Sequence, residues 1–329
     1  MINEIKGRKR IDLENPLTWY LIGVALSDGW IKIGQLMLLV KDKAFAEKFA
    51  SVARAIGLHA KEPALRKESW ETYTCSRELS RLAKRVKENP DIIRKLPEQC
   101  FLKFLEGFYE GDGSVTIEHG KRLIIKMEQK VGKGREKIIF VIGKGLEKLG
   151  LKIKLKCYIR NDQHPMNGKR IKNIYVGIYI RDKFSVYTFF NLINPVIKNP
   201  RTGSPPIYLL RKREDTGKIW SELWKALCLE ILKQEARDWK VYRASGRLRV
   251  RIILTKDKVE AERKAEFLAS LGFKPEINEL EGRYIVILRQ KEGVKKAVEL
   301  GAPVNPHALN GKLRKSWKTL ITQQKFNKT

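Results

Sequence analysis

Apolar and polar positions recur along the chain in one order, which predicts a repeated set of helices and strands. A nearly continuous apolar stretch predicts a buried helix, the alternation after it predicts two short strands, and apolar residues at helical spacing then predict an amphipathic helix. A further strand and a further helix complete the set. In the first part of the chain we expect helices at residues 18–27, 42–56 and 77–87, and strands at 30–33, 36–40 and 72–75.

The same order of elements returns in the second part of the chain. Stretches rich in proline and charged residues at 88–98 and 211–217 divide the sequence into three parts. The expected domains are residues 1–100, 101–212 and 213–329, and the expected fold class is α+β. In the second part we expect helices at 100–111, 135–149 and 184–192, and strands at 114–117, 122–128, 151–160 and 172–181.

Two stretches of nine residues share a layout, LIGVALSDG at 21–29 and LEGFYEGDG at 105–113. Small residues four positions apart give each predicted helix a face on which another backbone can approach closely. If the two helices pack along these faces, Asp28 and Asp112 lie side by side at two helix C-termini. The small residues are Gly23 and Ser27 in the first stretch, and Gly107 and Gly111 in the second.

A carboxylate pair at this position favours a bound cation. Asp28 and Asp112 would repel each other and the negative ends of both helix dipoles unless a divalent cation lay between them. The four cysteines and four histidines are scattered without a CxxC pair, which argues against a zinc site or a disulfide framework. Oxygen ligands alone suit Mg²⁺, Mn²⁺ or Ca²⁺, and beside a polyanion such ions favour phosphodiester chemistry.

The net charge indicates a polyanionic partner. The 68 Lys and Arg against 37 Asp and Glu leave a net charge of +31, which favours nucleic acid. The lysine-rich surface of a thermophile is the alternative, although such surfaces usually raise Glu together with Lys. No apolar run has the length of a membrane span and the N-terminus lacks the apolar core of a signal peptide, so we expect a soluble cytoplasmic protein without a membrane partner.

The twin stretches resemble the LAGLIDADG motif of homing endonucleases, in the monomeric form that carries two motifs, over residues 17–210. The resemblance implies two αββαββα repeats that pack as a pseudo-twofold dimer, with a saddle-shaped sheet over double-stranded DNA. It also implies a free-standing, intron-derived monomer that makes a staggered, site-specific double-strand cut. The implied cofactor is Mg²⁺ or Mn²⁺, with Ca²⁺ as a non-catalytic substitute.

By that resemblance, Asp28 and Asp112 are the catalytic metal-binding carboxylates, one for each DNA strand. Lys41 and Lys130 follow or end the second strands and match a basic residue that helps to organise the attacking water. A different nuclease pattern is also present, because Asp112 followed by Glu128 and Lys130 resembles the D…ExK signature of restriction-type enzymes. That short pattern leaves Asp28 without a role.

Strand alternation predicts nucleic-acid-binding faces that are almost purely cationic. In residues 151–160 one face is basic and aromatic, and the other, with Ile153, Leu155, Cys157 and Ile159, is expected to face the core. An ordinary solvated sheet face is the alternative. The residues expected to contact nucleic acid are Lys32, Gln35, Lys126, Lys152, Lys154, Lys156, Tyr158, Arg160, Tyr175, Tyr179, Arg181, Arg247, Arg249 and Arg251.

The third part is a degenerate repeat. Residues 41–58 and 256–273 are identical at seven of 18 positions at a constant offset of 215, which indicates duplication. Applied to the first motif, the same offset makes Arg243 the counterpart of Asp28 in the third part (28 + 215), so the third part has lost the motif aspartate. The first hairpins are short, so either the third part adds contact area or the ligand is structured intron RNA. A splicing maturase and a DNA-binding regulator that no longer cuts therefore stay open as alternatives.

Overall fold

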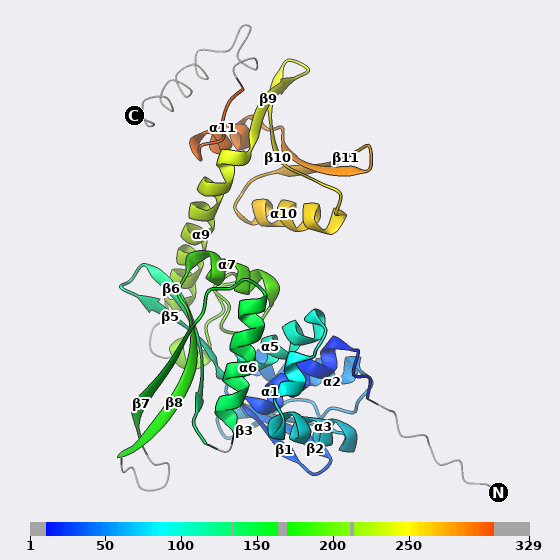
Figure 1. The fold of residues 1–329 in the computed structure, drawn as a ribbon, viewed down its shortest axis with the longest axis vertical. Coiled ribbons are helices and arrows are strands. Elements are labelled where there is room, and N and C mark those ends of the chain that lie inside the picture. Colours follow the sequence, from blue (N-terminus) through cyan, green and yellow to red (C-terminus); the bar gives the residue numbers. More distant parts are fainter. Residues whose placement is uncertain (1–10, 133, 164–169, 211–213, 306–329) are drawn as a thin grey trace, which may run out of the picture. The chain divides into compact units, whose positions relative to one another are not determined.

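A computed structural model describes residues 11–132, 134–163, 170–210 and 214–305. The chain divides into two compact units, Met1–Trp224 and Lys225–Thr329. The described part is of the α+β class, with three four-stranded antiparallel sheets, two in the first unit and one in the second (Figure 1). The expected domain boundaries after residues 100 and 212 stay predictions.

All three sheets have the same strand order. In each, a first hairpin is followed by a helix and a second hairpin, and the last strand pairs back with the second. The orders are β1-β2-β4-β3, β5-β6-β8-β7 and β9-β10-β12-β11. The strands are β1 (Gly29–Lys32), β2 (Gln35–Val40), β3 (Ala64–Arg66), β4 (Ser69–Cys75), β5 (Gly113–Glu118), β6 (Arg122–Lys130), β7 (Lys154–Gln163), β8 (Arg170–Ile180), β9 (Lys240–Ala244), β10 (Arg247–Thr255), β11 (Pro275–Leu280) and β12 (Arg283–Leu288).

From α1 to α7 the helices follow the predicted order, apart from the short α4; the apolar pattern did not predict the short α8 either. Their turns are too short to show a helical period. The helices are α1 (Pro16–Leu26), α2 (Lys43–Ala55), α3 (Arg77–Glu88), α4 (Asp91–Arg94), α5 (Glu98–Asp112), α6 (Arg135–Lys148), α7 (Lys183–Leu192), α8 (Ile207–Leu210), α9 (Thr216–Glu235), α10 (Lys258–Ser270) and α11 (Lys291–Glu299). None of the helices in the described ranges combines the length and the apolar character that crossing a bilayer requires.

Helices α1 and α5 pack backbone against backbone. A Cβ atom at Gly23 would overlap the carbonyl oxygen of Phe104 and lie 2.8 Å from the nitrogen of Phe108. A Cβ at Gly107 would likewise overlap the carbonyl oxygen of Tyr20. The small residues of the two motifs therefore form the contact that their spacing predicted.

The Asp-Gly pair that ends each motif turns the chain from helix into strand. The Ser27 hydroxyl donates to the Gly23 carbonyl at 3.0 Å and closes the last turn of α1. A Cβ at Gly29 would lie 2.7 Å from the Cα of Ala25, and one at Gly113 would overlap the carbonyl oxygen of Tyr109. Glycine is thus required where the new strand folds back against its own helix, and each aspartate is held at the turn.

The second hairpin of the second sheet corrects two expectations. Lys152 lies before β7, where its backbone N–H donates to the Ser185 hydroxyl at 2.8 Å. The apolar face of β7 is also only partly covered, because Leu155 is 41% exposed and Ile159 is 66% exposed. The reason is that β7 and β8 form a long ribbon that runs past the helices covering the base of the sheet (Figure 1).

The third sheet follows the first at two different offsets. At the hairpin turns, Gln35 corresponds to Arg247, an offset of 212 (247 − 35). Helices α2 and α10 begin 215 apart (258 − 43), and the register of β10 shifts between Arg251 and Ile253. The longer, irregular β10 accounts for the change, so the residue opposite Asp28 is Lys240 (28 + 212), and the expected match to Arg243 is wrong.

The helix contact can be tested by adding a single methyl group. Gly107→Ala should lower the free energy of unfolding by at least about 2 kcal/mol, because the backbone of α1 cannot move away without opening the core. Chemical denaturation measures the change. The matched control is Gly143→Ala in α6, where the new Cβ would lie 3.1 Å from the flexible Ile153 Cδ1 and alanine is the better helix former by about 1 kcal/mol. Equal effects of the two substitutions would contradict the close helix contact.

Candidate active site

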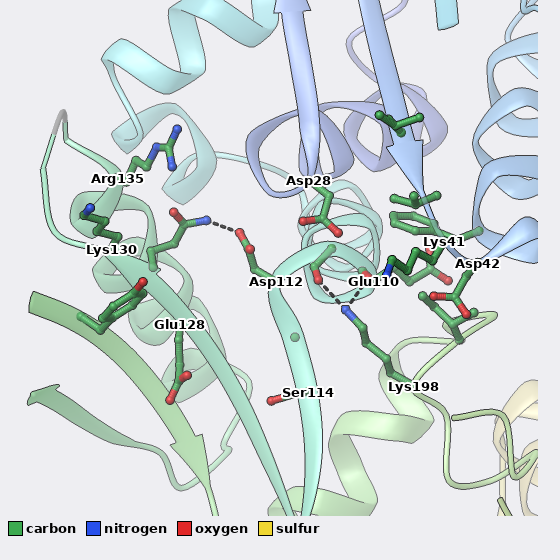
Figure 2. Close-up of a pocket in the computed structure, with 18 of the residues that line it drawn as sticks. Asp28, Lys41, Asp42, Glu110, Asp112, Ser114, Glu128, Lys130, Arg135 and Lys198 are labelled. Atoms are coloured by element: carbon green, nitrogen blue, oxygen red, sulfur yellow. Dashed lines mark hydrogen bonds between the residues drawn. The ribbon is translucent and has the colours of Figure 1, made fainter. Parts of the chain in front are cut away.

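One cavity of about 690 Å³ receives all four expected catalytic side chains, Asp28, Lys41, Asp112 and Lys130. It lies in the first unit, where the C-terminal ends of α1 and α5 meet the ends of β2 and β6 (Figure 2). The helix contact delivers the two aspartates, and the second strand of each sheet delivers one lysine. The sequence therefore predicted which side chains share the cavity.

Both aspartates are electrostatically strained. Burial, and after it the charge of Asp28, raise the pKa of Asp112 to about 7 against the opposing effects of Lys198, Arg135 and Gln129. The Asp28 side chain is exposed to the cavity, yet the protein atoms around it and the charge of Asp42 raise its pKa as well. The positive charges around Asp28 and Asp112 are therefore too few to keep both carboxyl groups as readily ionised as in water.

Lys198 supplies part of that charge from a segment that carried no sequence signal. Its side chain is buried, and its ammonium donates to the carbonyl oxygens of Glu110, at 2.7 Å, and Gly111 (Figure 2). Burial lowers its pKa, whereas the charges of Asp28 and Asp112 raise it. One lysine in so basic a chain shows no pattern, and only the path of the loop brings it to the site.

Asp42 is a second functional candidate that the sequence did not indicate. An aspartate just before a helix is typical of an N-cap, yet its side chain makes no capping hydrogen bond in α2. Its Oδ1 accepts instead from the backbone N–H of Ile207 at 2.8 Å, and the side chain lines the cavity. Burial raises the pKa of Asp42, which adds a third carboxyl group on the Asp28 side.

Two further acids of the second motif support the helices from within. Lys48 of α2 donates to Glu106 Oε1 at 2.7 Å and to Glu110 Oε1 at 2.9 Å. Tyr20 of α1 donates to Glu110 Oε2 at 2.5 Å. Burial raises the pKa of both Glu110 and Tyr20. The spacing of the two glutamates in an otherwise apolar helix could have indicated a shared buried partner.

The opposite wall comes from the second sheet. Gln129 donates to Asp112 Oδ2, and Lys130 and Arg135 line the cavity beside them (Figure 2). Glu128 also lines it, so the structure does bring the D…ExK residues together. The Glu128 carboxylate, however, already accepts from the Tyr179 hydroxyl at 2.6 Å.

The cationic face of the second sheet is less purely cationic than expected. Arg160 forms an ion pair with Asp162 at 2.8 Å, and Arg181 forms one with Glu118 at 3.2 Å. The hydrogen bond from Tyr175 to Asp162 lowers the pKa of that carboxyl to about 2. Asp162 shares the face of Arg160 because it lies two residues further along β7, and Glu118 reaches Arg181 from β5, on the other side of β6.

Aromatic rings order the basic side chains of this face. Tyr158 and Tyr175 stack with their ring centroids 5.9 Å apart, and the Arg160 guanidinium lies 3.8 Å from the centre of the Tyr175 ring. Lys126 and Lys156 lie 5.2 and 4.9 Å from the centre of the Tyr179 ring. Lys154 pairs with Tyr179 across the strands. Arg160 and Tyr175 also reach the cavity, so this face is continuous with the site.

The remaining expected contacts are not among the residues that line the cavity. Lys32 and Gln35 face each other at the β1–β2 turn, where Gln35 donates to the Cys75 sulfur at 3.6 Å. In the second unit, β10 carries three arginines at alternate positions next to β9. Their roles in binding stay predictions. These arginines are Arg247, Arg249 and Arg251, which lie opposite Ala244, Tyr242 and Lys240.

The residues of the cavity fit a hard divalent cation. Within the described ranges, no group of three or more His, Cys, Asp and Glu side chains is arranged to hold a metal ion. Asp28 and Asp112 nevertheless offer carboxylate oxygens near the carbonyl oxygens that end α5, which is the donor chemistry of Mg²⁺, Mn²⁺ and Ca²⁺. The pKa values of both carboxyl groups are raised, chiefly by burial, and a cation bound beside a carboxylate favours its charged form.

Comparisons with known proteins give remote likenesses. No family model matches the chain, and no curated protein matches it. Among solved structures, it is similar to I-DmoI in complex with DNA and Ca, at 14% identity over 55% of this chain and 91% of that chain, with a TM-score of 0.38. It is also similar to the N-terminal LAGLIDADG domain of DUF199/WhiA (11% identity, 56% and 86% covered, TM-score 0.40). The homing endonuclease I-WcaI bound to its DNA recognition sequence is a further match (20% identity, 57% and 84% covered, TM-score 0.37).

The strained carboxylate pair predicts a pH-dependent stability. Because folding raises the pKa of Asp112 to about 7, its contribution to stability is present below the pKa of about 4 of the unfolded chain and is lost as pH rises through about 7. Asp112→Asn cannot ionise, so its free energy of unfolding should exceed that of the wild type by about 4 kcal/mol at pH 8, and the gain should vanish near pH 4. Denaturant unfolding across this range measures the difference.

A matched control is Asp91→Asn, which removes an exposed carboxylate paired only with Arg94. Its effect should stay within about 0.5 kcal/mol at every pH. A wild type as stable as Asp112→Asn at pH 8 would show that Asp112 is not strained in the folded protein.

Proposed function

We propose that this protein is a divalent-metal-dependent endonuclease that cuts double-stranded DNA at specific sites by phosphodiester hydrolysis. The observation that carries the proposal is the convergence of Asp28 and Asp112, from two helix ends, in one cavity lined by lysines. The resemblance of both motifs to LAGLIDADG supports it. The excess of 31 positive charges in the chain supports a polyanionic substrate.

Each side chain of the cavity has a distinct task in this proposal. Asp28 and Asp112 hold divalent metal, which when bound would activate water and stabilise the leaving oxygen. Lys41 and Lys130 are both exposed to the cavity, so they can orient a scissile phosphate and its attacking water. Gln129 donates to Asp112 and orients that carboxylate. This division assigns one aspartate and one lysine to each strand, which gives a staggered cut.

The DNA backbone would lie along the open faces of the two sheets of the first unit. Lys126, Lys154 and Lys156 lie on the face that leads into the cavity through Arg160 and Tyr175. Ion pairs on this face hold Arg160 and Arg181 in place, so their binding to phosphate involves exchange of partners. The three arginines of β10 would extend the contact through the second unit.

A second candidate function is RNA binding by a splicing maturase of the same fold. The stacked pair of Tyr158 and Tyr175 on the open face favours it, because unpaired RNA bases stack on aromatic side chains. The two candidates differ in what they require of the aspartates. An endonuclease needs both, whereas RNA binding and splicing do not.

Replacing the aspartates separates the two functions. In Asp28→Asn/Asp112→Asn, cleavage of plasmid DNA with Mg²⁺ should fall by more than about 1,000-fold, which is the scale expected for lost electrostatic stabilisation, because both metal ligands lose their charge at constant shape. DNA affinity should be kept or increase as repulsion toward phosphate falls. Each single variant should retain nicking of one strand. A randomised duplex library, incubated with the wild type and Mg²⁺, first identifies a sequence that is cut, and the plasmid carries that sequence. Asp91→Asn is the control that should keep full activity.

The double variant also reports the alternative. Cleavage by Asp28→Asn/Asp112→Asn at the wild-type rate would remove these carboxylates from catalysis. A wild type that binds structured RNA tightly and never cuts DNA would establish the RNA-binding function, and its RNA affinity and any intron splicing should then be unchanged in the variant.

The role of the second unit is tested by the salt dependence of binding. Arg247→Gln/Arg251→Gln should reduce the slope of log affinity against log salt by about 1.8, since each lost phosphate contact removes about 0.9. The control Lys258→Gln/Lys295→Gln removes two exposed positive charges from helices of the same unit, each paired with a glutamate. A filter-binding titration that gives the same slope for both pairs would exclude the β10 face from binding.

A further inference from the structure

We propose that Lys198 is a resident cation of the candidate active site, and that its ammonium competes with divalent metal for the oxygen atoms between Asp28 and Asp112. The inference rests on the proposed function only in taking these two aspartates as the metal-binding carboxylates. It assigns a role to a residue that lies outside both motifs, in the segment after α7.

Several hydrogen bonds fasten this segment to α5. The backbone N–H groups of Asn194 and Val196 donate to the side chains of Glu106, at 3.2 Å, and Glu110, at 2.5 Å. The Tyr109 hydroxyl donates to the carbonyl oxygen of Lys198 itself at 2.8 Å. The backbone of Lys198 is therefore held against the last two turns of the motif helix.

The backbone conformation at this position shows that the side chain matters. Lys198 has φ +58°, in the left-handed region that glycine and asparagine adopt at lower cost. A lysine here carries a conformational penalty, and burial of its ammonium is a second cost. Both costs are explained if the positive charge is needed at this location.

The ammonium contacts the atoms that a metal would use. It donates to the carbonyl oxygens of Glu110 and Gly111, the two residues before Asp112. It also interacts electrostatically with Asp28 most strongly, then with Asp112 and Asp42. Carbonyl and carboxylate oxygens are equally the ligands of hard divalent cations, so the ammonium and a metal ion share partners and repel each other.

The two halves of the site are therefore unequal. Lys198 and Asp42 lie on the side of Asp28, whereas Asp112 is approached by Gln129 and Arg135 from the other wall (Figure 2). Metal uptake at Asp28 should be the weaker of the two, because the resident charge already occupies part of its surroundings.

A capping role alone would predict a different result. An ammonium that only satisfied the carbonyl oxygens at the end of α5 would stabilise the helix, and its loss would lower stability without changing the affinity for metal. Competition predicts that loss of the ammonium raises the affinity for metal. Direct metal binding therefore distinguishes the two roles.

The test is a titration of the full chain with Mn²⁺ in the absence of nucleic acid. Electron paramagnetic resonance and calorimetry measure the affinity for Mn²⁺. Lys198→Met, which keeps the length of the side chain, should bind Mn²⁺ at least tenfold more tightly than the wild type. Adding Asp28→Asn to Lys198→Met should abolish the gain. The control is Lys43→Met, which removes the lysine next to Asp42 in the sequence, whose side chain is 57% exposed. Solvent screens the charge of this lysine, so the affinity for Mn²⁺ should stay within about twofold of the wild type.

Stability measurements cover the case in which Lys198→Met folds poorly. Mn²⁺ should then raise its melting temperature more than that of the wild type, and Lys198→Gln should behave in the same way. If Mn²⁺ affinity is unchanged in both variants, or if neither folds at saturating Mn²⁺, the ammonium is structural and the proposal is overturned. Absence of DNA cleavage by a wild type that shows these Mn²⁺ shifts would instead refute the endonuclease function and leave the role of Lys198 in place.

Discussion

The direct contact between the backbones of α1 and α5 determines the arrangement of the first unit. Gly23 and Gly107 each occupy a point where a Cβ atom would overlap a carbonyl oxygen of the other helix. The two helices also end near each other, so Asp28, just after α1, and Asp112, the last residue of α5, line one cavity. The glycine after each aspartate then turns the chain into the first strand of its sheet. One steric condition thus places both candidate metal ligands and sets the origin of both sheets.

The same contact creates an electrostatic problem that other residues reduce. Two helix C-termini and several carboxyl groups meet where little water is available, and the pKa of Asp112 rises to about 7. Lys48 neutralises Glu106 and Glu110 behind the helices, and Lys198 caps the end of α5. These lysines do not fully neutralise the negative charge of Asp28 and Asp112. An enzyme that binds divalent metal between them would need this residual negative charge, at the cost of stability in the absence of metal.

Repetition of one sheet topology shows what can change while the fold is kept. All three sheets have the same strand order, but only the first two follow a helix that ends in Asp-Gly. The third sheet has an irregular β10 and a lysine in the position of Asp28. Its hydrophobic core, built around Trp239, Val250 and Phe273, is its own. The sheet topology is therefore kept even where the motif helix and its aspartate are absent.

Local patterns in the sequence determined most elements of the first unit, the pairing of the motif helices and four of the cavity residues, Asp28, Lys41, Asp112 and Lys130. These features depend on periodicity, on the size of side chains at fixed spacing and on residues next to a turn, which are all properties of neighbouring positions. The offset of 215 located the third repeat by the same logic. It failed at Arg243 because an irregularity in one strand changes the register without leaving a mark in the composition.

Tertiary structure alone decided the surroundings of the aspartates. Lys198 and Asp42 reach the cavity because the segment after α7 folds back along α5 and then contacts the start of α2, which joins residues 42 and 207. The pairing of Arg181 with Glu118, and the exposure of Leu155 and Ile159, depend on how β5 and β8 flank β6 and on where the covering helices end. Such contacts join positions far apart in the chain, so their energies cannot be read from the residues on either side.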